Sequence, residues 1–319
     1  MIRMAMARPR PLSFLTLGDI STDDWPRLFD RAATLKAERD RVRPTPLAGM
    51  TVALVFDKPS TRTRVSFQVA AYELGGQSVE MSLATSQLGR GEPISDTARI
   101  LSGYCHAIVV RTFGQDRVAA YAKAASIPVI NALTDQHHPC QVATDLFTVR
   151  EHFETIEGLR YAWIGDGNNM AQSWIEAAGM FGFDLVLACP DGFAPDPLLV
   201  AAARDAQGRL GRGSVMLTAD PRQAAAGAHV ISTDVWASMG QEEDAARRRA
   251  AFAGYCVDGA MLSRAAANAI VLHCLPAHRG EEITGEVLDG PHSLAWVQAE
   301  NRLHVGKVLL EHVMIRSRG

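Results

Sequence analysis

The sequence predicts an α/β fold with two doubly wound parallel-sheet domains and a cleft between them. The chain has 319 residues, which is too long for one ordinary core and fits two domains of about 150 residues each. Strand and helix patterns alternate over most of this length, as they do in parallel α/β proteins. Polar clusters directly follow the strands, at the edge of an open α/β sheet where ligands bind.

The expected strands are short apolar runs separated by helical patterns. In chain order they cover Thr51–Phe56, about Ala107–Val110, Pro128–Asn131, Tyr161–Ile164, Leu185–Ala188, Val215–Leu217, Val230–Ser232 and Ile270–Cys274. The clearest helices start near Val65, follow Pro139, and cover Met170–Phe181 and about Leu294–Ile315. The alternation restarts after the helix that follows Pro139, so we expect one domain over residues 1–150 and a second over 151–293.

Composition and charge exclude several classes of protein. Apolar residues make up 47% of the chain and charged residues 21%, which excludes a disordered chain. The formal net charge of -3 gives no basic excess for nucleic acid, and no apolar run is long enough to span a membrane. The five cysteines include no CxxC pair, which indicates a reducing compartment and neither a disulfide framework nor a zinc site. Residues 1–14 resemble a transit peptide only faintly, and we interpret them as a short extension.

The segment from Asp57 to Arg64 has the composition of a phosphate site. It follows a strand, and Ser60 or Thr61 can cap the next helix. A helix N-terminus offers free N–H groups and a positive dipole end, and Arg62 adds a guanidinium that can hold phosphate through two hydrogen bonds. The alternative is a capped helix whose arginines are solvated or paired with carboxylates.

Further candidates follow the later strands of the first domain. Arg111 ends a buried strand, where an arginine either binds an anion or pairs with a carboxylate. His138 precedes a proline and is held extended, and the helix that follows can bring His138 and Gln141 together. Metal binding by His137 and His138 is a competing idea, although adjacent residues of an extended chain point apart. A surface histidine with a structural role is the other alternative.

The second domain offers candidates for binding an amino acid. Residues 165–170 resemble a dinucleotide-binding turn, but Met170 replaces the third glycine and no acidic partner follows at the expected distance, so we predict no nicotinamide cofactor. Asp234 ends a strand and suits an ammonium group, with a helix cap as the alternative. Cys274 ends the last strand, but no Ser-His-Asp or Gly-x-Ser-x-Gly pattern supports covalent hydrolase chemistry.

Together these segments closely resemble the aspartate/ornithine carbamoyltransferase family. Ser60-Thr-Arg-Thr-Arg64 is similar to the carbamoyl phosphate loop of that family, and His138-Pro-Cys-Gln141 to its second shared motif. The elements that resemble its ornithine-using members are Asp234 with Ser238-Met239-Gly240, His273-Cys-Leu-Pro276 and Gln87-Leu-Gly-Arg-Gly-Glu-Pro93. The resemblance covers the chain from about Leu12 onward, in the right order.

The resemblance implies a site for two small molecules, carbamoyl phosphate and ornithine. By similarity, carbamoyl phosphate contacts Ser60, Thr61, Arg62, Thr63, Arg111, His138, Gln141, Cys274, Leu275 and Arg302, with Gln87 reaching a neighbouring subunit's site. Ornithine contacts Asn169, Asp234, Ser238 and Met239. The expected catalytic residues are Arg62, Arg111, His138, Asp234 and Cys274, whereas Arg64 is expected to buttress the loop.

The resemblance also implies the reaction and its setting. The δ-amine of L-ornithine attacks carbamoyl phosphate through a tetrahedral intermediate, with no metal, cofactor or covalent enzyme intermediate, and L-citrulline and phosphate are released. We expect a cytoplasmic homotrimer in arginine metabolism, with no nucleic-acid or membrane partner, whose C-terminal helix of about 294–319 packs back on the first domain. Aspartate, putrescine and an N-acylated ornithine are alternative acceptors, and a non-catalytic sulfate- or phosphate-binding module is the unrelated alternative.

Overall fold

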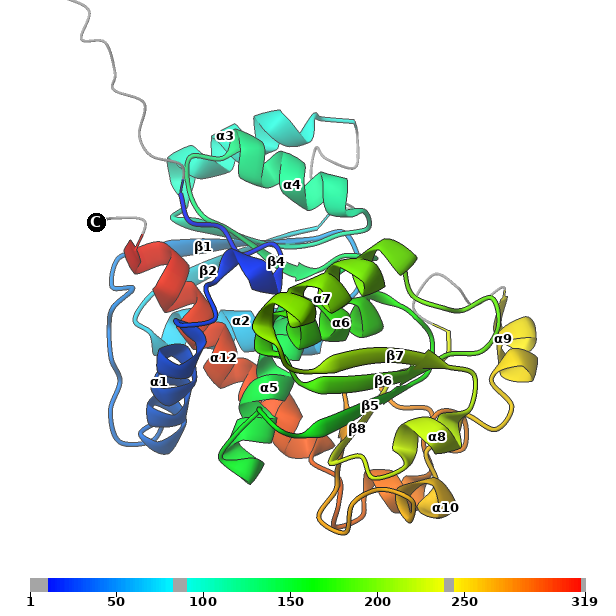
Figure 1. Cartoon of the computed structure of the whole chain (residues 1–319). Helices are drawn as coiled ribbons and strands as arrows, with labels where there is room; N and C mark the ends of the chain where they lie inside the picture. The colour runs from blue at the N-terminus through cyan, green and yellow to red at the C-terminus, as the bar shows by residue number, and fades with distance from the viewer. Residues whose placement is uncertain (1–10, 83–90, 238–243, 317–319) are drawn as a thin grey trace, which may run out of the picture.

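The computed structural model describes residues 11–82, 91–237 and 244–316, which form two sheets with helices packed on them (Figure 1). The first sheet has the strand order β2-β1-β3-β4 and the second β7-β6-β5-β8-β9. Every pair of neighbouring strands in these sheets is parallel. The predicted class, α/β with two doubly wound parallel sheets, is therefore confirmed.

The elements have the following bounds. The strands are β1 (Thr51–Phe56), β2 (Gln77–Ser82), β3 (Ala107–Arg111), β4 (Val129–Leu133), β5 (Arg160–Ile164), β6 (Asp184–Ala188), β7 (Ser214–Thr218), β8 (Val230–Thr233) and β9 (Ile270–His273). The helices are η1 (Leu17–Asp19, a 3-10 helix), α1 (Trp25–Ala37), α2 (Arg62–Glu73), α3 (Ile94–Tyr104), α4 (Gln115–Ala124), α5 (Pro139–Phe153), α6 (Asn169–Phe181), α7 (Pro197–Leu210), α8 (Pro221–Ala225), α9 (Ala245–Ala251), α10 (Gly259–Leu262), α11 (Gly285–Leu288) and α12 (Ala295–Arg316). The predicted last strand was too long by one residue, because it ends at His273 and not at Cys274.

Buried strands explain why the apolar runs were continuous and not alternating. In β1, Val52 and Leu54 belong to the largest core cluster, whereas Ala53 and Val55 belong to a cluster on the opposite face. Successive side chains of a strand point to opposite faces, so a strand with helices on both faces needs apolar residues at every position.

The long helices connect the two halves of the molecule. Helix α12 packs against α1, α2 and α5, and its N-terminal end also contacts β9 of the second sheet (Figure 1). Helix α5 leads from the first sheet toward the second and packs against α6. The largest core cluster includes side chains of these helices and extends from one half of the molecule into the other. No helix of the described chain is both long and apolar enough to cross a membrane.

Candidate active site

The carboxyl ends of both parallel sheets open onto one cleft of about 1390 Å³. The first sheet contributes residues that follow β1, β3 and β4, and the second sheet contributes residues that follow β5, β8 and β9. The predicted residues that line this cleft are Ser60, Thr61, Arg62, Thr63, Arg111, His138, Asn169, Asp234, Cys274, Leu275 and Arg302. The structure therefore brings together eleven positions that are spread over more than 240 residues of sequence.

Four predicted residues do not join this lining. Gln141 is fully buried one helical turn beyond His138. Gln87, Ser238 and Met239 lie outside the described residues. The expected cap of α2 is also absent, because Thr61 occupies the N-cap position but its side chain makes no capping hydrogen bond. Ser60 and Thr61 line the cleft instead.

Three guanidinium groups meet at one end of the cleft. Arg111 and Arg302 are 7% and 8% exposed, and both donate hydrogen bonds to Thr63 Oγ1. Arg62 Nη2 donates to the Leu275 carbonyl oxygen at 2.6 Å. Burial, together with the charge of Arg302, lowers the pKa of Arg111 to about 10. Within the described residues no carboxylate forms an ion pair with these three arginines, so their combined charge is left for an anion.

His138 lies beside this cationic end as a buried histidine. It is 4% exposed, and its backbone N–H donates to Ser173 Oγ at 2.8 Å. Burial and the charges of Arg302, Arg111 and Arg62 lower the pKa of His138 well below its usual value. The imidazole is therefore neutral at physiological pH and can donate one ring N–H to a ligand oxygen.

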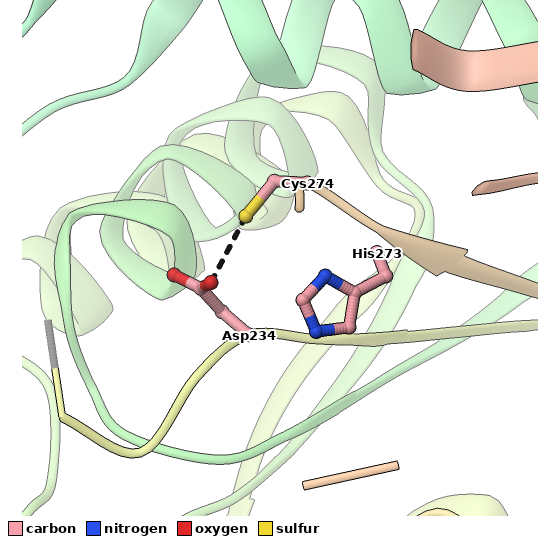
Figure 2. Close-up of side chains that lie close together, drawn as sticks. All are labelled: Asp234, His273 and Cys274. Atoms are coloured by element: carbon pink, nitrogen blue, oxygen red, sulfur yellow. Dashed lines mark hydrogen bonds between the residues drawn. The ribbon is translucent and has the colours of Figure 1, made fainter. Parts of the chain in front are cut away.

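The other side of the cleft carries a carboxylate and a thiol in contact. Asp234 Oδ1 accepts the S–H of Cys274 at 3.0 Å (Figure 2). The same oxygen accepts the backbone N–H of Val235 at 2.8 Å, and Asp234 Oδ2 accepts from Asn168 Nδ2 at 3.1 Å. Burial and the Asp234 charge raise the pKa of the Cys274 thiol well above its usual value. Cys274 is therefore a protonated thiol and a poor nucleophile.

The side chain of His273, the neighbour of Cys274, forms hydrogen bonds within the loop that follows β9 and does not line the cleft. Its Nδ1 accepts the backbone N–H of Leu275 at 2.9 Å, and its Nε2 lies 2.9 Å from Glu282 Oε1. Both side chains of that pair are fully buried. The tautomer is fixed by the Leu275 N–H, so Nε2 carries the proton and donates to Glu282.

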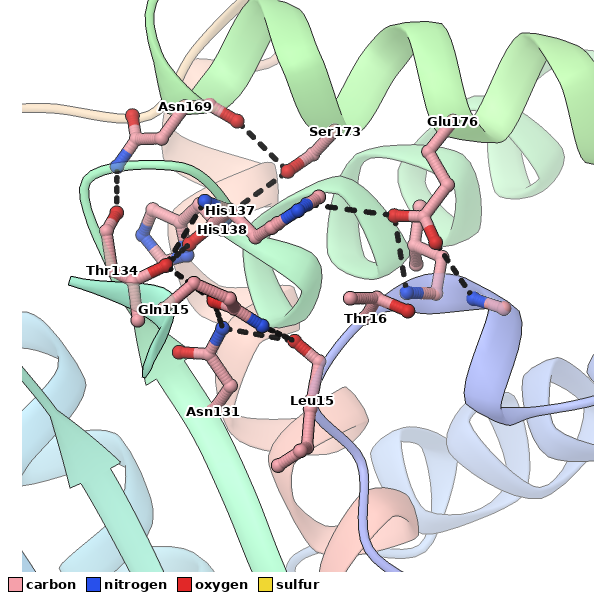
Figure 3. A network of polar contacts seen from close by, with 12 residues as sticks. Leu15, Thr16, Gln115, Asn131, Thr134, His137, His138, Asn169, Ser173 and Glu176 are labelled. Atoms are coloured by element: carbon pink, nitrogen blue, oxygen red, sulfur yellow. Dashed lines mark hydrogen bonds and ion pairs between the residues drawn. The ribbon is translucent and has the colours of Figure 1, made fainter. Parts of the chain in front are cut away.

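Three side chains on one face of α6 form hydrogen bonds with segments of the first half of the molecule (Figure 3). Asn169 Nδ2 donates to the Thr134 carbonyl oxygen at 2.6 Å, and Asn169 also lines the cleft, where the resemblance implies an ornithine contact. One turn further along, Ser173 Oγ accepts from the His138 amide and donates to the Asn169 carbonyl at 2.8 Å. Glu176 accepts the Gly18 amide at 3.0 Å and lies 3.7 Å from His137. The turn that bears Asn169 is therefore bonded directly to the segment that bears His138.

Several polar residues at the cleft were not identified from the sequence. Lys58 pairs with Asp135 and lies 4.6 Å from the Phe113 ring centre. Arg248 donates to Asp166 Oδ2 at 2.6 Å and to the Trp236 carbonyl at 2.7 Å. Arg248 stands in a run of three arginines, so nothing in the local sequence separates it from its exposed neighbours.

Two groups of side chains in the described part of the chain have the spacing of metal ligands. They are Asp234, His273 and Cys274, and His278, Glu281 and Glu282, with ligand atoms within 4.8 Å of one another. In the first group both His273 nitrogens already have partners. In the second group Glu281 pairs with Arg249 and Glu282 Oε1 accepts from His273 and from the His278 amide.

The fold and the site define a two-domain α/β protein whose cleft carries three guanidinium groups at one end. Residues 12–151 match the carbamoyl-P binding domain of the aspartate/ornithine carbamoyltransferase family, and residues 157–313 match its Asp/Orn binding domain. The chain belongs to this family.

Within this family, the chain is similar in sequence and in structure to ornithine carbamoyltransferases. An ornithine carbamoyltransferase of Pelobacter propionicus is 53% identical over 94% of this chain and 98% of its own length. The crystal structure of ornithine carbamoyltransferase from Gloeobacter violaceus has a TM-score of 0.85 at 46% identity and covers 95% of this chain and 98% of that one. The Pyrococcus furiosus ornithine carbamoyltransferase has a TM-score of 0.91 at 42% identity and covers 97% and 99% of the two chains.

Proposed function

We propose that this chain transfers the carbamoyl group of carbamoyl phosphate to the δ-amine of L-ornithine, giving L-citrulline and phosphate. The observation that carries this proposal is the cleft itself. Arg62, Arg111 and Arg302 have no carboxylate partner among the described residues, and Asp234 stands across the same cleft. This arrangement suits a dianion at one end and an ammonium group at the other. The ornithine carbamoyltransferases at about half identity support the same pair of substrates.

The cationic end binds carbamoyl phosphate and stabilises the transition state. Arg62 and the N-terminus of α2 hold the phosphate, whose charge grows as it leaves. The carbonyl oxygen gains negative charge in the tetrahedral intermediate and accepts hydrogen bonds from Thr63, Arg111 and neutral His138. The remaining proposed contacts are Ser60, Thr61, Gln87, Gln141, Cys274, Leu275 and Arg302.

The opposite end binds ornithine and presents a neutral amine. An alkyl ammonium has a pKa near 10, so the δ-amine must lose a proton before it attacks. Asp234 is placed to hold the δ-ammonium and to accept that proton, with the Cys274 thiol as its hydrogen-bonded neighbour. Asn169, Ser238 and Met239 complete the proposed ornithine contacts. The amine then attacks the carbamoyl carbon directly, and the C–O bond to phosphate breaks with its electron pair on phosphate.

We also propose the setting of this reaction. The first domain covers residues 1–150 and the second 151–293, and α12 returns to the first domain, where it packs on α1, α2 and α5. A cytoplasmic homotrimer that takes part in arginine metabolism is the expected form. Exposed apolar side chains at the β2 edge of the first sheet support an interface between copies, and they are Val65, Tyr72, Val79, Ile100 and Tyr104.

The choice of acceptor tests the proposal. We expect kcat/KM at saturating carbamoyl phosphate to be highest for ornithine and up to about 10⁴-fold lower for putrescine and N-acetylornithine, because each lacks a charge that the site is built to bind. Citrulline formation gives the readout for ornithine, and phosphate release gives it for all three. Equal turnover of either analogue would overturn the ornithine assignment, and no turnover of any amine would leave only a phosphate-binding module.

A further inference from the structure

A fully buried carboxylate lies directly behind the carbamoyl phosphate site. Asp145 is 0% exposed and stands one turn after Gln141 on α5. It forms no ion pair among the described residues, and its partners are two side-chain amides. Asp145 Oδ1 accepts from Gln141 Nε2 at 2.8 Å and from Gln298 Nε2 at 2.5 Å. The charges of Arg302 and Asp234, which line the cleft, act on this carboxyl group.

The direction of the hydrogen bond between Gln298 and Asp145 is fixed by a backbone donor. The His273 backbone N–H donates to Gln298 Oε1 at 2.9 Å, and a backbone N–H cannot exchange its role. Gln298 must therefore present its NH₂ group to Asp145. Asp145 Oδ1 is then the acceptor for Gln298, and the same oxygen accepts the NH₂ group of Gln141.

Two acceptors have no partner after these bonds are made, Asp145 Oδ2 and the Gln141 carbonyl oxygen. Gln141 Oε1 is buried and has no hydrogen-bond partner. Leaving a buried carbonyl unpaired is unfavourable unless a ligand supplies the donor. Carbamoyl phosphate carries such a donor in its amino group, whereas acetyl phosphate has a methyl group at the same place.

We propose that Asp145 is a positioning residue that turns the Gln141 carbonyl toward the carbamoyl amino group and so selects carbamoyl phosphate over acyl phosphates without an N–H. This inference rests on the proposed function, and in particular on the contact between Gln141 and carbamoyl phosphate. The selection depends on the orientation of the Gln141 amide. A flipped Gln141 would direct its NH₂ group at the NH₂ group of carbamoyl phosphate.

Binding titrations with three probes test this role. We define the discrimination as Kd for acetyl phosphate divided by Kd for carbamoyl phosphate, with inorganic phosphate as the control for the cationic end. Asp145→Leu removes the acceptor and should lower the discrimination about 10-fold, with the Kd for inorganic phosphate changed less than about 3-fold. Asp145→Asn keeps a carbonyl oxygen for both amides and should retain the discrimination of the wild type.

A double-mutant comparison separates positioning from a general structural effect. In a Gln141→Leu background, which already lacks the carbonyl, Asp145→Leu should cause no further loss of discrimination. If the leucine variant does not fold, Asp145→Ser serves instead, because its hydroxyl is too short to reach both amides.

Three results with the Asp145 variants would overturn the inference. They are wild-type discrimination in folded Asp145→Leu, an equal loss in Asp145→Asn, and a further loss in the Gln141→Leu background. Wild-type discrimination in Gln141→Leu alone would remove the Gln141 contact and the inference with it. A wild-type protein that binds carbamoyl phosphate but makes no citrulline would instead contradict the proposed reaction and leave the discrimination measurable.

Discussion

Three neighbouring guanidinium groups repel one another, and none of them forms an ion pair with a carboxylate in the part of the chain that the structure describes. Burial and the charge of Arg302 lower the pKa of Arg111, and burial and the charge of Arg62 lower the pKa of Arg302, which records the electrostatic cost of holding these groups together without an anion. A bound dianion removes that cost, so ligand binding should also stabilise the fold around these three arginines.

Replacing Arg62 with alanine should weaken carbamoyl phosphate binding and leave the fold intact. A hydrogen bond to a charged group contributes about 1.5–3 kcal/mol, so the affinity should fall roughly 10- to 150-fold. Isothermal titration with carbamoyl phosphate measures it. Arg64→Ala is the matched control, because Arg64 is exposed and pairs with Glu80 at 2.9 Å. Unchanged affinity in folded Arg62→Ala, or an equal loss in Arg64→Ala, would remove Arg62 from the phosphate site.

Replacing Asp145 with asparagine should stabilise the protein at alkaline pH. Burial raises the pKa of Asp145 to about 7, above the value of about 3.9 for an unfolded aspartate. Protonation therefore favours the folded state, and the wild type loses stability as the pH rises through 7. At pH 8 the asparagine variant should be more stable by about 2–4 kcal/mol, and the difference should shrink between pH 7 and pH 4.

Thermal unfolding from pH 4 to pH 8 measures this difference. A variant that is less stable than the wild type at pH 8, or a difference that does not depend on pH, would show that the buried carboxylate is not destabilising. The expected outcome is a buried carboxylate that lowers the stability of the folded protein at alkaline pH.

At the scale of secondary-structure elements, one face of α6 bonds to segments of the first half of the molecule, among them the segment that bears His138. The α6 residues at positions 169, 173 and 176 lie on one face and bond to the segments that bear Thr134, His138 and Gly18 (Figure 3). Residues spaced by three and four share a face of a helix, so this contact requires no special local geometry. A displacement of α6 would be transmitted to the backbone of His138.

Replacing Ser173 with alanine should raise the activation free energy that sets kcat by more than it lowers the free energy of unfolding. The change removes the hydrogen bond to the His138 amide, and a neutral bond of this kind contributes about 0.5–1.5 kcal/mol, or roughly 2- to 13-fold in rate. Steady-state kinetics and thermal unfolding measure the two effects.

Ser102→Ala is the control for the Ser173 variant. Ser102 Oγ also donates to a carbonyl four residues earlier and accepts a backbone N–H, but its partners are Ala98 and Ser126. We expect similar losses of stability in the two variants and a loss of kcat only in Ser173→Ala. Equal kcat values in both would mean that the α6 contact has no role in catalysis.

At the scale of the whole molecule, the site is proposed to be complete only in an oligomer. Strand β2 lies at the edge of the first sheet, and Tyr72 on α2 and Tyr104 on α3 are exposed. Exposed apolar side chains beside an open sheet edge are typical of an interface with another chain.

Mixing two inactive variants tests whether subunits share sites. Arg62→Ala and Gln87→Ala subunits should regain activity after reversible dissociation and reassociation, because some hybrid sites then escape both substitutions. For random trimers of equal composition the recovered activity should approach about a quarter of the wild-type value, since a shared site takes one intact residue from each of two neighbours. Confirmed hybrids without recovered activity would indicate self-contained sites.

The sequence by itself determined most of the architecture and the positions of most of the proposed site residues. Continuous apolar runs predicted eight of the nine strands in the described part of the chain, because most of these strands are covered on both faces and are apolar throughout. Strand β2 was missed because it lies at a sheet edge, where its half-exposed residues show no continuous apolar run. Polar clusters after the strands predicted the cleft because the carboxyl ends of parallel strands share one edge.

Only the tertiary structure decided which of these residues touch and in which chemical state. The thiol of Cys274 meets Asp234 across 40 residues of sequence, and Gln298 reaches Asp145 across 153. Such contacts depend on how whole elements pack, and no local pattern encodes them. The same packing sets burial, and burial is what neutralises His138, keeps Cys274 protonated and places Asp145 behind Gln141.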